Sequence, residues 1–274
     1  PDEVPAMTIN RFCSSGLQAT SIVADRIAVG GMDAGIAGGV ESMSMIPMGG
    51  NRIALNPRLA EAYPDAYAPM GNTAENVARK FEVARADQDQ FAYESHKKAV
   101  AAWAEGRFAA EVVPVKTRVY EGDAWIDVVV DKDEGPRADT SLEKLATLKP
   151  VFDPTGSVTA GNSSPLNDGA AAVVLMDADK ATQSGKKIRA YFRAFQVAGV
   201  PPGIMGIGPV PAVRKLLAKT GFKIDQIDLF EVNEAFASQS LYCLRELGLP
   251  KDRVNVNGGA IALGHPLGGS GARL

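Results

Sequence analysis

The first forty residues combine short apolar runs with a helical repeat. Residues 6–12 (AMTINRF) predict a short buried strand, and residues 34–40 predict a second. Between them, four apolar residues recur at the spacing of one helix face: Ala19, Ile22, Val23 and Ile27. Gly30 and Gly31 end this repeat. Strand, tight turn, helix and strand in this order predict a buried, mainly parallel sheet.

The segment from residue 41 to 167 differs in composition from the residues before it. It is rich in Pro, Met and Asn up to about residue 70, and it carries a charged stretch near its end. Its patterns predict helices over 73–81 and 87–105 and strands over 111–117 and 125–130. We interpret this segment as an inserted subdomain, after which residues 168–177 (DGAAAVVLMD) return to the texture of a buried strand.

From residue 187 the chain alternates again between strand and helix patterns. Strands are predicted over 188–195, 228–232 and 254–256, and helices over 209–219 and 235–247. We therefore expect three units: an N-terminal half formed by 1–40 and 168–186, the insertion 41–167, and a C-terminal half over 187–274.

Composition excludes several classes of protein. The 274 residues carry a net charge of -3, which gives no basic excess for binding nucleic acid. The longest strongly apolar run, residues 170–176, is too short to span a membrane. Only two cysteines occur, far apart, so we expect no disulfide framework and a reducing, cytoplasmic setting. The two histidines have no metal-ligand spacing, and no metal site is expected.

Cys13 is the first candidate for chemistry. It lies between a predicted strand and a predicted helix, followed by Ser14, Ser15 and Gly16. A helix N-terminus favours thiolate, and small neighbours leave room for a substrate. The alternative is that Cys13 is a small buried apolar residue.

His265 is the second candidate, in the run GGAIALGHPLGGSG over residues 258–271. The backbone of a loop with so many glycines is able to approach a ligand closely, and Pro266 fixes the turn after the imidazole. A lone histidine is otherwise more often structural, but a candidate thiol elsewhere favours a role as a base here.

Asn233 is the third candidate, at the end of a predicted strand and the start of a predicted helix. It or Glu234 would serve as a helix N-cap, or Asn233 would hold a water or donate to an oxyanion. Three further features favour structural interpretations. Cys243 is expected in the core, His96 on a solvated helix face, and the methionines 43, 45 and 48 in the core rather than along an acyl chain.

Five motifs together resemble the thiolase family, in that family's order. They are NRFCSSGLQA (10–19), GGVESMS (38–44), TAGNSS (159–164), NEAFA (233–237) and NGGA with GHP (257–260 and 264–266). The resemblance covers essentially the whole chain. It implies an α/β fold: a five-layered αβαβα core of two related halves, with an inserted loop domain that binds coenzyme A.

The resemblance also implies roles for the three candidates. Cys13 would be the acylated nucleophile, and His265 would activate it. His265 would also stabilise a thioester enolate together with a water held by Asn233. No prosthetic group is implied, because coenzyme A and acyl-CoA are substrates. Cleavage of a 3-ketoacyl thioester needs a nucleophile for the ketone and donors for the departing enolate, and these groups supply both.

Coenzyme A contacts are also implied by motif position. Ser164, Ala160 and Phe152 would line the pantetheine path, and Met70, Met205, Ala235 and Phe236 would lie near its reactive end. Arg137 would meet the phosphate or adenine end, or else be a solvated surface residue. The family further implies a homodimer or a dimer of dimers acting on acyl-CoA.

The sequence departs from the family pattern at both ends. The family's further strand–helix units before the nucleophile are not in the printed chain, and neither is its second cysteine, in a Cys-x-Gly motif beyond the Gly-His-Pro loop. The residue that would protonate the enolate and one N–H of the acyl oxyanion hole are thus not in the printed sequence. We therefore expect this polypeptide alone to be impaired in turnover.

Within the family, Pro69-Met70-Gly71-Asn72 resembles the degradative 3-ketoacyl-CoA thiolases (acetyl-CoA C-acyltransferases of fatty-acid β-oxidation). Two alternatives stay open: a biosynthetic acetoacetyl-CoA thiolase, and a non-catalytic acyl-CoA or lipid carrier on the same fold. A decarboxylating condensing enzyme is disfavoured, because that class places a second histidine where Asn233 stands.

Overall fold

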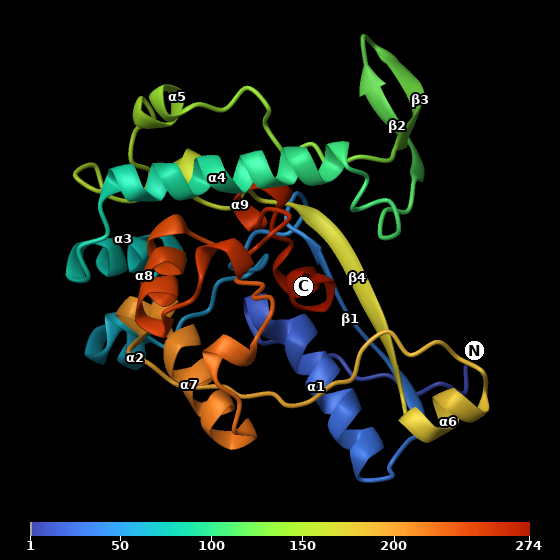
Figure 1. Cartoon of the computed structure of the whole chain (residues 1–274). Coiled ribbons are helices and arrows are strands. Elements are labelled where there is room, and N and C mark those ends of the chain that lie inside the picture. The colour runs from blue at the N-terminus through green and yellow to red at the C-terminus, as the bar shows by residue number, and fades with distance from the viewer. Residues whose placement is uncertain (1) are drawn as a thin grey trace.

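A computed structural model describes residues 2–274 (Figure 1). The longer elements are, in order, α1 (Ser15–Ala28), β1 (Ala34–Ser42), α2 (Pro57–Ala62), α3 (Met70–Lys80), α4 (Arg85–Ala104), β2 (Val115–Glu121), β3 (Ala124–Val130), α5 (Leu142–Ala146), β4 (Asp168–Met176), α6 (Ala178–Gln183), α7 (Pro209–Thr220), α8 (Ala237–Leu247), α9 (Ala260–Leu263) and α10 (Leu267–Arg273). Short 3-10 turns include η1 (Phe12–Ser14), η3 (Ala160–Asn162) and η4 (Pro202–Ile207).

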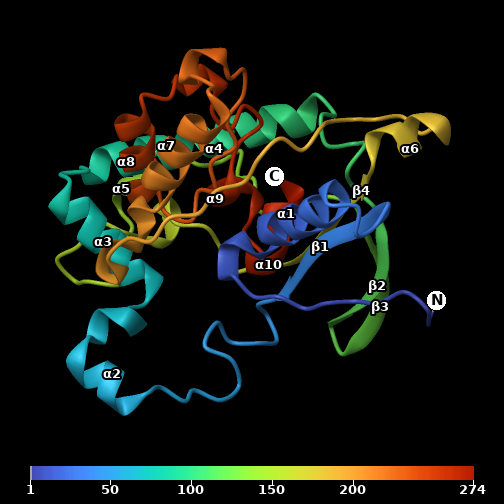
Figure 2. The same cartoon turned by 90° about the horizontal axis from the view of Figure 1, so that it is seen from below.

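The two sheets are antiparallel pairs, so the prediction of a mainly parallel sheet was wrong. β1 pairs with β4 from Ala34 opposite Met176 to Ser42 opposite Asp168, and β2 pairs with β3 as a hairpin. Both β1 and β4 are apolar on their two faces, because the outward side chains are apolar as well as the inward ones. Strands of that composition do not reveal the direction of their neighbour. The β2–β3 hairpin projects from the body (Figures 1 and 2).

Helices α1 and α10 pack against each other and both contact the β1–β4 pair, and glycines make this close packing possible (Figure 2). A Cβ at Gly16 of α1 would overlap the backbone nitrogen of Ala272. A Cβ at Gly39 of β1 would overlap the carbonyl oxygen of Gly268. Larger residues at these positions would separate the elements, so backbone-to-backbone contact holds the start of α1 against α10.

A second part of the core forms where α3, α7, α8 and η4 meet. Val77, Val83, Val210, Tyr242 and Cys243 form one buried cluster. Cys243 is 1% exposed, and its thiol donates to the Gly206 carbonyl oxygen at 3.5 Å, which confirms the predicted core position.

Two side-chain predictions outside the candidate site were wrong. His96 is buried on α4 rather than solvated, because its Nδ1 accepts the backbone N–H of Arg137 at 3.2 Å and the loop covers that helix face. Met45 and Met48 are exposed rather than in the core, since they belong to the turns that follow β1.

Helix predictions were more accurate than strand predictions. The predicted helix over 209–219 corresponds to α7, and Gly221 ends it in the left-handed conformation with φ of 75°. Residues 6–12 and 188–195 form no strand, because neither segment has a hydrogen-bonded neighbour among residues 2–274. The strands predicted over 228–232 and 254–256 are reduced to one parallel bridge between Phe230 and Val254. None of the described helices is long and apolar enough to cross a membrane.

Candidate active site

Cys13 lies in the turn that opens α1. Phe12, just before it, has a φ of 46°, and its backbone N–H donates to Asn10 Oδ1 at 2.8 Å. The Ser15 hydroxyl closes the turn by donating to the Phe12 carbonyl oxygen and accepting the N–H of Arg11. A left-handed φ at a phenylalanine is strained. The strained turn places Cys13, which is half-buried, at the N-terminal end of the helix.

The Cys13 thiol is not acidified by its position, contrary to the prediction from the helix end. Burial raises its pKa to about 11, and the nearby Glu41 carboxylate adds to this effect. A hydrogen bond with the Cys13 backbone lowers the pKa but does not outweigh burial. Cys13 is therefore a thiol at neutral pH and needs a base to become a nucleophile.

The loop that carries His265 is fixed on both sides. Gly264 has a φ of 99°, and a side chain there would contact Asn167. The backbone N–H of His265 donates to Asn167 Oδ1 at 3.0 Å, and Pro266 leads directly into α10. Only glycine adopts such a φ without strain, so the loop geometry sets the direction of the imidazole.

Hydrogen bonds select one tautomer of the His265 imidazole. Its Nδ1 lies 2.6 Å from Ser270 Oγ, and that hydroxyl donates its single proton to the Pro266 carbonyl oxygen at 3.0 Å. Ser270 Oγ must therefore accept a proton from Nδ1. This leaves Nε2 unprotonated, where it faces the Asn233 side-chain amide at 3.2 Å.

The His265 imidazole is neutral at physiological pH. The side chain is 3% exposed, and burial lowers its pKa to about 4. A neutral imidazole with an unprotonated Nε2 is able to accept a proton from a thiol or to donate one back after protonation.

Asn233 lies in the segment between the bridge residue Phe230 and α8. Helix α8 begins at Ala237 with Phe236 at its N-cap, so neither Asn233 nor Glu234 caps it. The N-cap interpretation was wrong, since the chain runs extended for several residues before the helix starts. The Asn233 amide instead contacts His265.

Contacts with α10 bring the nucleophile and the base to the same part of the molecule. The turn η1, which contains Cys13, packs against α10, and His265 precedes α10 by two residues. Glu41, which raises the pKa of Cys13, also accepts the backbone N–H of Gly268 at 3.0 Å. Figure 2 shows α1, α10 and β1 next to one another. The Cys13 turn and the pair formed by His265 and Asn233 thus both lie next to α10.

Several residues predicted to contact coenzyme A form a second cluster. The rings of Phe152 and Phe236 meet edge to face with centroids 5.9 Å apart. The N–H of Ser164 donates to the Ala235 carbonyl oxygen at 2.9 Å. Gly71, which follows Met70, leaves no room for a side chain because the Phe152 ring lies against it.

The remaining predicted contacts differ in position. Met205 lies in η4, which packs against α3, and is 41% exposed. Ala160 begins η3 and is exposed. Arg137 is exposed, and its backbone lies against His96 on α4. Among residues 2–274, no hydrogen bond or ring contact joins Arg137 to the Phe152–Phe236 pair.

Sequence reasoning missed three residues that hold the site: Glu41, Asn167 and Ser270. Glu41 and Ser270 fall inside motifs noted for other reasons, but their hydrogen-bond partners do not follow from the motifs. Asn167 reaches a partner 98 positions away in the chain. Only the folded structure brings such pairs together.

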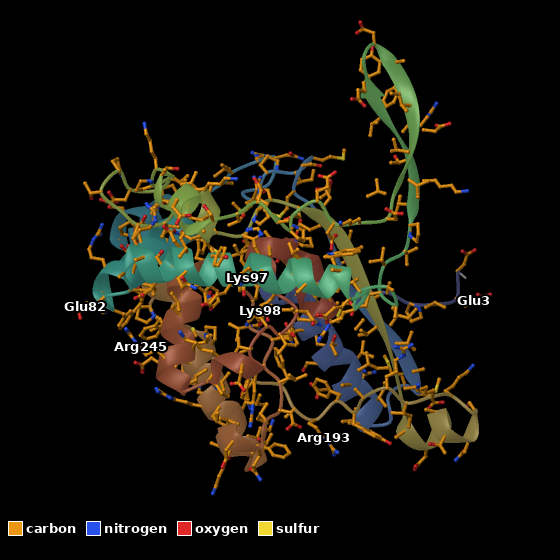
Figure 3. All side chains as sticks on the ribbon, turned by 45° about the horizontal axis from the view of Figure 1, so that its top comes forward. Glu3, Glu82, Lys97, Lys98, Arg193 and Arg245 are labelled. Carbon is orange, nitrogen blue, oxygen red and sulfur yellow. The ribbon has the colours of Figure 1, made fainter. Side chains whose placement is uncertain are left out.

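Two further features lie outside this site. Residues 2–274 contain no group of three or more His, Cys, Asp or Glu that could hold a metal ion. A cavity of about 610 Å³ lies between α4 and α8, and its lining includes Glu82, Lys98 and Arg245, which are labelled in Figure 3. Cys13 and His265 do not line it, whereas Glu234 does.

Comparisons with known proteins place both parts of the chain in one family. The family model described as "Thiolase, N-terminal domain" matches residues 1–179, and "Thiolase, C-terminal domain" matches residues 186–274. The chain is 52% identical to the 3-ketoacyl-CoA thiolase of Bacillus subtilis, with 100% of this chain and 71% of that protein covered. It is 50% identical to the peroxisomal 3-ketoacyl-CoA thiolase A of Mus musculus, covering 100% of this chain and 65% of that protein.

Solved structures show the same relationship. The dimeric peroxisomal thiolase of Saccharomyces cerevisiae superimposes with a TM-score of 0.89 at 43% identity, covering 97% of this chain and 67% of that one. The acetyl-CoA acetyltransferase of Bacillus anthracis gives 0.88 at 44% identity, covering 100% and 71%. The expected thiolase-like α/β fold is confirmed by these matches. The chain spans roughly two thirds of the length of these relatives, and it belongs to the thiolase family.

Proposed function

We propose that this chain carries the acyl-transfer site of a 3-ketoacyl-CoA thiolase, an acetyl-CoA C-acyltransferase of fatty-acid β-oxidation. The observation that carries the proposal is the imidazole of His265, held neutral with Nδ1 on Ser270 and Nε2 toward Asn233, beside the helix that packs on the Cys13 turn. The names of the most similar relatives support this choice of activity.

The reaction follows from the protonation states of the resting site. The Cys13 proton passes to His265 Nε2 as Sγ attacks the ketone carbon of the 3-ketoacyl thioester. The bond between the second and third acyl carbons then breaks, and its electron pair leaves as the enolate of acetyl-CoA, which takes up a proton. The shortened acyl group stays on Cys13 as a thioester. The thiol of coenzyme A attacks this thioester, and Cys13 recovers its proton.

Asn233 and His265 act on the enolate. The enolate oxygen is negatively charged, and it is stabilised by the protonated imidazole and by a water held on the Asn233 amide. The aromatic pair Phe152 and Phe236, with Ser164 and Ala235, supplies the apolar path for pantetheine. Met70, Met205 and Ala160 extend this path, and Arg137 meets the phosphate end of coenzyme A.

Three broader features belong to the same proposal. The insertion 41–167 is the coenzyme A-binding unit between halves formed by 1–40 with 168–186 and by 187–274. The protein is a homo-oligomer, either a dimer, like the dimeric yeast thiolase, or a tetramer, and sedimentation velocity distinguishes the two. Both cysteines are free thiols, which fits the cytoplasm.

The test is product analysis after mixing the chain with acetoacetyl-CoA and free coenzyme A. We expect two acetyl-CoA molecules for each acetoacetyl-CoA consumed, and none with Cys13→Ala. Stoichiometric binding of acetoacetyl-CoA with no acetyl-CoA formed and no acetyl group on Cys13 would support a carrier and contradict a thiolase.

A second candidate is an acetoacetyl-CoA thiolase, because the Bacillus anthracis structure is named an acetyl-CoA acetyltransferase. A series of 3-ketoacyl-CoA substrates of increasing length separates the two. Activity that persists with medium and long acyl chains supports the degradative enzyme, and activity confined to acetoacetyl-CoA supports the second candidate.

A further inference from the structure

The short segment that carries Asn233 is held from both sides. The Asn255 side chain accepts the backbone N–H of Val232 at 2.7 Å and donates to the Val232 carbonyl oxygen at 2.8 Å. On the other side, the Glu234 carboxylate is fixed by its own hydrogen bonds. Asn233 therefore lies between two anchored neighbours, which limits the movement of its amide.

Glu234 is a buried carboxylate with a full set of donors. Its side chain is 2% exposed, and it accepts from Ser95 Oγ at 2.6 Å, Asn255 Nδ2 at 2.8 Å and the backbone N–H of Ile261 at 3.2 Å. Burial raises the pKa of Glu234, and these donors and the charge of Lys98 oppose that rise. All three direct partners donate, which is the environment of an ionised carboxylate.

The partners of Glu234 belong to different elements. Ser95 comes from α4, Asn255 from the segment after the bridge residue Val254, and Ile261 from α9, four residues before His265. Ser95 Oγ also accepts the backbone N–H of Gly259 at 3.0 Å. One carboxylate thus joins the segment that carries Asn233 to the segment that leads to His265.

A buried carboxylate joins two segments at a large cost in desolvation free energy. Removing a charge from water costs several kcal/mol, and hydrogen bonds recover only part of this cost. The ammonium of Lys98 is engaged with the Val254 carbonyl oxygen at 2.9 Å, and no ion pair of Glu234 occurs within residues 2–274. An apolar contact would hold the segments together at lower cost but with less precise direction.

We propose that Glu234, with Ser95 and Asn255, is a positioning network that aligns the Asn233 amide with His265 Nε2. These three residues are the Glu234 network. The inference rests on the proposed function for its effect on the reaction, but the alignment is measurable without any reaction. Glu234 acts through Asn233 and does not touch substrate.

The chain contains a matched control for this network. Glu75 on α3 is 4% exposed and accepts the backbone N–H groups of Ser157 and Val158 at 2.8–3.0 Å. The Ser157 hydroxyl also lies 3.4 Å from Glu75 Oε2. Glu75 is therefore a second buried carboxylate that holds a loop with a serine partner, but its hydrogen bonds reach Ser157 and Val158 and not the segments of Asn233 or His265.

The experiment compares Glu234→Gln with Glu75→Gln by nitrogen-15 NMR of the imidazoles. The chain has only two histidines, and His96 provides an internal reference. His96 Nδ1 accepts a backbone N–H, so His96 and His265 are opposite tautomers with separate signals. Glu234→Gln places amide protons against existing donors, and we expect it to shift and broaden the Nε2 signal of His265 alone.

The kinetic arm measures the rate at which acetyl-CoA acylates Cys13. We expect Glu234→Gln to slow it about tenfold, as is usual when a supporting hydrogen bond is lost. Glu75→Gln lowers the melting temperature but leaves the His265 signal and the rate unchanged. Ser95→Ala and Ser157→Ala form a milder pair, and Ser95→Ala alone should shift the His265 signal. That pair decides the question if Glu234→Gln does not fold.

Two results would overturn the network. One is a parent-like His265 signal in Glu234→Gln and Ser95→Ala. The other is an equal shift in Glu75→Gln, which would mean that any buried carboxylate loosens the site. If the parent chain is not acylated, the proposed function fails, and the NMR comparison still decides whether Glu234 aligns Asn233.

Discussion

The chain contains two cysteines and two histidines, and each of two regions of the molecule holds one cysteine and one histidine. Cys243 lies in the buried cluster of α3, α7 and α8, and His96 is buried on α4, whereas Cys13 and His265 both lie next to α10. Burial raises the pKa of Cys13 to about 11 and that of Cys243 to about 12. Burial also lowers the pKa of both imidazoles. The direction of each pKa shift is therefore the same in the two regions.

The two regions differ in their neighbours. Cys243 is enclosed by apolar side chains and a backbone carbonyl, so its thiol has neither a base nor room for a substrate. Cys13 is half-buried beside the loop of an oriented neutral histidine. Burial alone makes inert thiols and uncharged imidazoles. The reactivity that we propose near α10 comes from the pairing of a protonated nucleophile with a base that the fold directs.

The largest expected effect separates the two histidines by one identical substitution. In His265→Asn the new amide keeps a donor toward Ser270 but has no basic nitrogen, so we expect acylation of Cys13 by acetyl-CoA to slow by about 100-fold or more. In His96→Asn the amide oxygen replaces Nδ1 as acceptor for Arg137, and the rate should stay within about threefold of the parent. Stopped-flow mixing with quenched mass analysis measures both. Equal losses in the two variants would remove the distinction between the regions.

The next effect concerns stability against pH. The folded pKa of His265 is about 4, below the unfolded value of about 6.5, so protonation favours the unfolded chain. The neutral His265 imidazole contributes about 3 kcal/mol to the free energy of unfolding. This contribution is fully present above a pH of about 6.5 and is lost as the pH falls through about 4. His96 adds to the loss in the same direction.

Urea unfolding at several pH values between neutral and acid measures this effect. We expect His265→Asn to show a shallower loss of unfolding free energy on acidification than the parent. An unchanged slope would mean that His265 is already charged in the folded protein, which contradicts its role as a resting base.

A smaller effect is expected at Ser270. Ser270→Ala removes the partner of His265 Nδ1, so the imidazole populates both tautomers and acylation slows about tenfold. Ser21→Ala is the control, since Ser21 is equally buried, on α1, and bonds only to Asp25. Nitrogen-15 NMR reports the tautomers directly. A single unchanged tautomer in Ser270→Ala would show that the loop, not the serine, orients the ring.

The sequence predicted helices well because their signals are local. Gly106 and Gly221 follow the last turns of α4 and α7 in left-handed conformations, as glycine after a helix predicts. Strands were harder to predict, because a strand forms only when it pairs with another strand, and the local sequence does not identify that partner. Residues 6–12 and 188–195 have strand-like composition and no partner among the described residues.

The candidate site shows the same division. Residue type, the glycine-rich loop and the family motifs single out Cys13, His265 and Asn233, and their catalytic roles stay predictions. The contacts that hold them were not predictable, because they depend on Glu41 reaching Gly268 and on Ser95 reaching Glu234. The pKa of Cys13 was predicted in the wrong direction, since the helix end is a local signal and burial is a property of the whole fold.

The central claim is that Cys13, and not Cys243, is the nucleophile of an acyl-transfer site. Intact-mass spectrometry after brief mixing with acetyl-CoA, followed by peptide mapping, tests it on the parent, Cys13→Ala and Cys243→Ala. We predict one acetyl group on Cys13 in the parent and in Cys243→Ala, and none in Cys13→Ala. An acetyl group that persists in Cys13→Ala, or a folded parent that binds coenzyme A yet is never acetylated, would contradict the account.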